Sequence, residues 1–174
     1  MTRRVSSLVA IPMVALILIG CVPDVRSEAE GVLVEQVTSS VYMMRLHLVD
    51  TKENSEVDLS VFSDMADVTL LDRIEAPRSA PASTLFCLEQ HGDEIDACMF
   101  YPALVRTQTG LSDTESNLYG CARLRGSLGA STIAAEDIAC PDELIAWAED
   151  AVVLEPPRSV SIVEIAGRRF EEDS

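Results

Sequence analysis

The chain has 174 residues, of which 13 are basic and 29 acidic, and its net charge at neutral pH is −16. Arg3 and Arg4 are the only charged residues among the first 20, so the part from residue 21 onward carries 11 basic and 29 acidic residues, a net charge of −18. So acidic a surface argues against binding to nucleic acid or to anionic headgroups, because both would repel it. The 154 residues that follow residue 20 are enough for one domain with a buried core.

The first 20 residues have the three parts of a secretory signal peptide. Arg3 and Arg4 form a basic start, residues 8–19 are an uncharged apolar run of twelve residues, and the small Gly20 precedes Cys21. The run is shorter than the roughly 20 apolar residues that a membrane-spanning helix needs. We therefore expect residues 1–20 to direct export and to be removed.

The last four residues of this stretch, Leu18-Ile19-Gly20-Cys21, resemble the bacterial lipobox. The resemblance implies a lipoprotein that begins at Cys21, whose thiol carries a diacylglyceryl group. Two or more acyl chains hold a protein stably on a membrane. The predicted partner of Cys21 is therefore the lipid bilayer of the bacterial cell envelope, to which the chain is anchored without spanning it. The alternatives are a signal peptide with an incidental cysteine and an uncleaved N-terminal anchor.

The remaining chain divides into a tether, a domain and a tail. Residues 21–31 read as the lipidated N-terminus and a short polar tether, residues 32–170 as a single domain, and residues 171–174 as a charged tail. Residues 76–83 contain two prolines and are expected to form a surface connection within that domain.

Residues 32–62 alternate between apolar and polar side chains. Met44, Leu46 and Leu48 are separated by polar residues, and the alternation resumes after the turn sequence DTKENS. Two period-2 segments around a polar turn predict an antiparallel hairpin. Residues 64–74 fit either a third strand or a short helix.

Four cysteines follow Cys21, and an even number in an exported chain predicts two disulfides. Residues 84–90 and 95–101 read as strands on either side of a two-residue turn at Gly92-Asp93. In that register the residue numbers of each opposed pair sum to 185, as 87 and 98 do. Cys87 and Cys98 are therefore directly across from one another on the same face. We therefore predict the pairs Cys87–Cys98 and Cys121–Cys140.

The last third of the chain predicts one clear helix. Residues 106–117 read as a polar loop, 118–125 as a strand, 131–139 as strand or helix, and 160–166 as a closing strand. Pro141 with two acidic residues after it is typical of a helix start, and a buried stripe follows at helical spacing: Leu144, Trp147, Ala148, Ala151 and Val152. The elements together predict an α+β fold, a mainly antiparallel sheet of hairpins with one helix in the C-terminal half and two disulfides.

The sequence contains no motif that assigns a chemistry after Cys21. Of its two histidines, His47 is expected half-exposed on a strand and His91 in a turn. There is no G-x-S-x-G, H-E-x-x-H or C-x-x-C motif and no glycine-rich phosphate loop. Cysteines in disulfides are not thiolate nucleophiles. We therefore predict no catalytic residues, no metal ligands and no cofactor.

Two acidic groups are candidate cation sites. One gathers at the predicted hairpin tip, where a cation would relieve the repulsion between like charges on paired strands: Glu89, His91, Glu94 and Asp96. The other has the alternate spacing of a calcium loop but lacks its glycine and its distal glutamate: Asp113, Glu115 and Asn117. We interpret both as solvated charges, and we expect Arg123 and Arg125 to pair with carboxylates.

These observations favour a membrane-anchored, surface-exposed lipoprotein that acts by binding, with an envelope protein as its partner. The first alternative is a small envelope hydrolase, since a pair of carboxylates alone can perform glycosidic chemistry. The second is a receptor for a cation or a solute, which only the carboxylates of the hairpin tip support.

Overall fold

The computed structural model describes residues 24–51, 57–71, 82–109, 112–150 and 155–172, so the signal sequence and Cys21 lie outside the described residues. In chain order the elements are α1 (Val25–Asp50), the 3-10 helix η1 (Leu59–Met65), β1 (Val68–Thr69), β2 (Thr84–His91), β3 (Glu94–Thr109), β4 (Ser112–Ser127), β5 (Ile133–Asp137), α2 (Asp142–Asp150), β6 (Arg158–Ser159) and α3 (Ile162–Glu172). Among the described residues no helix has both the length and the apolar character needed to cross a membrane.

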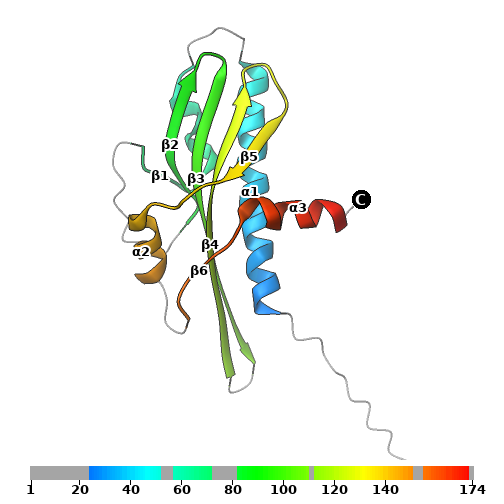
Figure 1. Cartoon of the computed structure of the whole chain (residues 1–174), viewed down its shortest axis with the longest axis vertical. Helices are drawn as coiled ribbons and strands as arrows, with labels where there is room; N and C mark the ends of the chain where they lie inside the picture. The colour runs from blue at the N-terminus through cyan, green and yellow to red at the C-terminus, as the bar shows by residue number, and fades with distance from the viewer. Residues whose placement is uncertain (1–23, 52–56, 72–81, 110–111, 151–154, 173–174) are drawn as a thin grey trace, which may run out of the picture.

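The α+β fold is confirmed, and its six-stranded sheet is mixed. The strands lie in the order β1-β2-β3-β4-β5, and β6 pairs with β4. The pairs β2–β3, β3–β4 and β4–β5 are antiparallel, whereas the two-residue strands β1 and β6 pair in parallel with β2 and β4. The long β3–β4 hairpin is the centre of the sheet, and its end extends beyond the other strands (Figure 1).

Helix α1 replaces the hairpin predicted over residues 32–62, and that prediction is wrong. The helix begins at Val25, after Asp24, whose side chain accepts a hydrogen bond from the Arg26 amide (3.2 Å). Residues 25–31, expected as part of a tether, therefore form its first turns. One face of the helix is buried against β3 and β4, with these residues inward: Ala29, Leu33, Val37, Ser40, Met44 and Leu48.

A glycine allows α1 to approach the sheet closely. A β-carbon at Gly126 of β4 would overlap the side chain of Leu48 and would lie 2.7 Å from Cδ1 of Ile133. Residues 64–74, for which strand and helix were both open, hold the end of η1 and then the short strand β1. Most of the predicted connection at 76–83 lies outside the described residues.

The predicted hairpin at 84–101 is confirmed in its turn and in its register. His91 pairs with Glu94, and Cys87 pairs with Cys98, before a bulge between Leu85 and Cys87 shifts the register by one residue. The polar loop predicted at 106–117 is wrong, because β3 runs on to Thr109 and β4 begins at Ser112. Residues 131–139, left open between strand and helix, contain β5.

The helix predicted after Pro141 is confirmed as α2, which covers part of the sheet face opposite α1. Trp147 stacks on Phe100 of β3, with ring centroids 6.4 Å apart. The cluster also contains Leu144 and the disulfide Cys121–Cys140, which joins β4 to the start of α2. Ala151 and Val152, the end of the predicted stripe, lie outside the described residues.

The closing strand predicted at 160–166 is wrong, because α3 occupies this segment. Ser161 caps the helix by accepting a hydrogen bond from the Glu164 amide (3.0 Å). The sequence Ser161-Ile-Val-Glu164 has the serine–glutamate spacing of a capping box, and the Asp137 carboxylate accepts from the Ile162 amide as well (2.7 Å). The described residues therefore form three α-helices where one was predicted, and residues 171 and 172 of the expected tail belong to α3.

Candidate functional site

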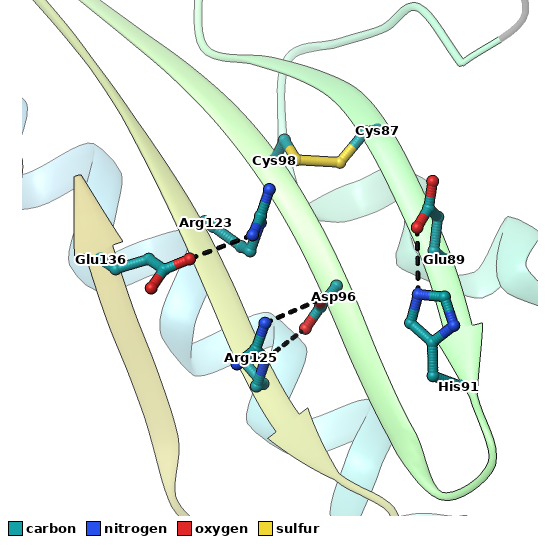
Figure 2. Close-up of a disulfide and its surroundings, with 8 residues drawn as sticks. All are labelled: Cys87, Glu89, His91, Asp96, Cys98, Arg123, Arg125 and Glu136. Atoms are coloured by element: carbon teal, nitrogen blue, oxygen red, sulfur yellow. Dashed lines mark hydrogen bonds and ion pairs between the residues drawn. A yellow bond between two sulfur atoms is a disulfide. The ribbon is translucent and has the colours of Figure 1, made fainter. Parts of the chain in front are cut away.

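Both predicted disulfides are present, and the Cys87–Cys98 bridge lies on the sheet face opposite α1 (Figure 2). Its Cα atoms are 4.8 Å apart because the two residues are directly opposed in adjacent strands. Charged side chains of four strands surround it: Glu89 and His91 of β2, Asp96 of β3, Arg123 and Arg125 of β4, and Glu136 of β5.

Two carboxylates of the acidic hairpin tip have partners within the same sheet. Arg125 makes two hydrogen bonds to Asp96 (2.7 and 3.1 Å), and this contact holds the pKa of the Asp96 carboxyl below its usual value. His91 Nε2 lies 3.0 Å from Glu89 Oε2. Arg125 therefore reduces the repulsion expected between Glu89 and Asp96, and the described residues contain no group of three His, Cys, Asp or Glu side chains that could hold a metal ion.

The calcium-loop pattern falls on a strand. Asp113, Glu115 and Asn117 alternate along β4, so their spacing places them on one face of a sheet. Glu115 accepts a hydrogen bond from the Arg106 guanidinium (2.6 Å) with its side chain fully buried, and the Asn117 amide donates to the Ala148 carbonyl of α2 (3.4 Å). These groups tie the outer end of the hairpin to its own strands and to α2.

The two histidines each pair with a carboxylate. His47 lies on α1, not on a strand, with Nε2 2.8 Å from Asp64 Oδ1 of η1 and its ring edge against Phe62. In the described part of the chain neither imidazole ring makes a hydrogen bond to a hydroxyl or thiol.

A second row of side chains follows α1 on the face away from the sheet. Its members recur at intervals of four and three residues, and all are exposed: Glu35, Ser39, Tyr42, Leu46 and Val49. We call this row the outer ridge. Tyr42, Leu46 and Val49 are 57%, 41% and 49% exposed and form an apolar stripe along the last two turns. Such spacing is that of a helix face that packs against another helix.

The outer ridge continues into a pocket of about 270 Å³ between α1 and the segment from η1 to β1. Glu35 and Ser39 of the ridge line it together with Gln36, Asp64, Asp67 and Ser83. The Gln36 amide donates to the Pro102 carbonyl (3.0 Å), while its buried Oε1 accepts no hydrogen bond among the described residues. The pocket is therefore lined by three carboxylates, which are acceptors suited to a cationic donor.

Sequence reasoning missed the outer ridge and the acidic pocket because both depend on α1 being a helix. The signal was present in the spacing of residues 35, 39, 42, 46 and 49, which fits a helix face as well as alternation fits a strand. Comparison with models of protein families, with curated proteins and with solved structures found no match.

Proposed function

We propose that the protein is a lipid-anchored, non-catalytic binding module of the bacterial cell envelope, and that its outer ridge holds a basic helix of an envelope protein. The anchor is supported by the export signal and by the lipobox-like LIGC, which would make Cys21 the first residue of the mature chain. Only three residues separate Cys21 from Val25, the first residue of α1. A chain of that length spans at most about 14 Å, so the proposed anchor keeps the domain next to the membrane.

The outer ridge is the observation that carries the binding proposal. Helix α1 already buries one complete face against the sheet, and it still carries an apolar stripe on the opposite face. Exposed apolar stripes are typical of contacts with another protein. The four-three spacing favours a helix as the bound element, because ridges at this spacing interdigitate with those of a facing helix.

The charge around the outer ridge favours a basic partner. Glu35, Asp64 and Asp67 line the pocket at the N-terminal end of the outer ridge, and the whole chain has a net charge of −16. A lysine or arginine of the partner would reach the pocket while apolar residues one or two turns away cover Tyr42 and Leu46. Acidic partners, including a second copy of this chain, would meet like charges at that point.

Two matched substitutions test the binding surface. Leu46→Glu places a glutamate on the apolar stripe. Arg45→Glu introduces a glutamate at the neighbouring exposed position, which is not part of the outer ridge. We expect Leu46→Glu to reduce the fraction of the protein that migrates in a larger complex after membranes are solubilised in mild detergent. Arg45→Glu should leave that fraction unchanged, and an equal loss in both variants would contradict the proposed surface.

Cys21→Ala tests the anchor separately. We expect this variant to leave the membrane fraction or to accumulate as an uncleaved precursor. Normal maturation together with normal membrane association would contradict lipidation, and would leave the outer ridge to be judged by the Leu46 and Arg45 variants alone.

A further inference from the structure

The two disulfides of the fold have different surroundings. Cys121–Cys140 lies in the apolar cluster with Phe100, Leu144 and Trp147. Cys87–Cys98 lies among charged side chains on the sheet face opposite α1, with Cys98 5% exposed and Cys87 half-buried. Around this second bridge, Arg123 is opposite Cys98, and Glu89 is two residues from Cys87 on the same strand.

A cation lies at the Cys98 end of this bridge. The β3–β4 register places Arg123 directly opposite Cys98, and Figure 2 shows its guanidinium beside that cysteine. Arg123 also makes one hydrogen bond to Glu136 (3.1 Å), and both side chains of this pair are well exposed to solvent. The remaining nearby anion, Asp96, is held by two hydrogen bonds from Arg125. Arg123 is therefore the cation that faces Cys98 across the strand pair.

An anion lies at the other end. Glu89 is two residues from Cys87 on the same strand face, where His91 is its hydrogen-bond partner (3.0 Å). A thiolate at Cys87 is therefore less stabilised than one at Cys98, since a nearby cation favours a thiolate and a nearby anion disfavours it.

We propose that Cys87–Cys98 is a redox-active disulfide that exchanges with a dithiol reductant, and that Arg123 fixes the direction of attack. The thiolate of the reductant attacks Cys87 Sγ, the Cys87–Cys98 bond breaks, and its electron pair leaves on Cys98 Sγ as a thiolate next to Arg123. The second thiol of the reductant, after losing its proton, then attacks the mixed disulfide and releases Cys87. In total the protein disulfide gains two electrons and two protons, and the dithiol becomes a disulfide.

The fold tolerates both redox states at this position. Hydrogen-bonded strand pairing continues on both sides of the bridge, from Leu88–Ala97 to His91–Glu94 toward the tip and from Leu85–Met99 toward the core. Neither cysteine lies in the cluster that holds Trp147. Reduction therefore removes a covalent link between two strands that remain paired.

Reduction of the purified, fully oxidised protein tests this proposal. With dithiothreitol we expect Cys87–Cys98 to open on the order of tenfold faster than Cys121–Cys140, without a change in Trp147 fluorescence, as mass spectrometry of alkylated peptides would show. With glutathione we expect the mixed disulfide on Cys87 and a free thiol at Cys98. Simultaneous opening of both bridges, or glutathione on Cys98, would overturn the assignment.

Two variants that break the same ion pair separate electrostatics from structure. Arg123→Gln removes the cation, and we expect it to slow the opening of Cys87–Cys98 about threefold or more, because a less stabilised thiolate is a poorer leaving group. Glu136→Gln frees the cation, and we expect an unchanged or faster opening. Equal slowing by both variants, or by neither, would contradict a role for Arg123, and thermal unfolding would verify that both variants are folded.

Discussion

Both faces of α1 carry apolar side chains, but one face packs against the sheet and the other is exposed. Leu48 is fully buried against the sheet, whereas Leu46, two residues earlier in the same helix, is 41% exposed. The inward row keeps α1 on β3 and β4, whereas Tyr42, Leu46 and Val49 remain 57%, 41% and 49% exposed. The same residue type therefore stabilises the fold on one face and remains available for a partner on the other.

The comparison also explains why α1 resembles a strand in sequence. Inward residues Met44 and Leu48 and outward residues Tyr42 and Leu46 interleave, so that every second position from 42 to 48 is apolar. A helix with one apolar face does not produce this alternation. Apparent period-2 patterning within a 26-residue helix is thus the mark of a helix with two apolar faces.

The largest expected difference comes from truncating one leucine on each face. Leu48→Ala should lower the free energy of unfolding by about 2–5 kcal/mol, because it leaves a cavity against the sheet. Leu46→Ala should change it by about 0.5 kcal/mol or less, since the side chain already meets solvent. Denaturant unfolding of both variants measures the difference, and similar losses would mean that both faces are buried in the fold.

Removing each disulfide should show that α2, unlike α1, depends on a covalent link. The loop closed by Cys121–Cys140 spans 19 residues, so replacing both cysteines by serine should cost about 3 kcal/mol and should change Trp147 fluorescence. The same change at Cys87 and Cys98 should cost about 2–3 kcal/mol and leave Trp147 undisturbed. A fluorescence change from the second pair alone would contradict the assignment of only Cys121–Cys140 to the cluster that holds Trp147.

A glycine on the sheet sets how closely the inward face of α1 can pack. Gly126→Ala should cost about 1–3 kcal/mol, because the added carbon overlaps Leu48 and forces α1 to shift. Gly167→Ala on α3 is the matched control, since its added carbon meets nothing within 4 Å and alanine favours a helix. Thermal unfolding of the two variants should therefore move in opposite directions.

The parts of the fold that were predicted correctly depend on local geometry. The turn at Gly92-Asp93 fixes the β2–β3 register within a few residues, so the Cys87–Cys98 pair followed from numbering alone and left Cys121 for Cys140. Helix α2 was found because it has one buried stripe and acidic residues in its first turn.

The errors arose where two physical signals compete. In α3, β-branched residues suggested a strand, but the cap at Ser161 and the Asp137 carboxylate fix a helix start. The outer half of the β3–β4 hairpin was read as a loop because its side chains are polar, and its strand pairing becomes clear only in the register from Leu104–Asn117 to Thr109–Ser112. Both outcomes depend on contacts between segments that are distant or weakly patterned in sequence.

Photo-crosslinking along α1 in intact cells tests the central claim most directly. A photoreactive residue is placed singly at positions 35 to 49, and the covalent products are compared by position. The account predicts crosslinks to one basic envelope protein from positions 39, 42, 46 and 49, with little product from the exposed off-ridge positions Thr38 and Arg45. Products without this four-three spacing, or an adduct of twice the mass of this chain, would contradict a basic partner helix on the outer ridge.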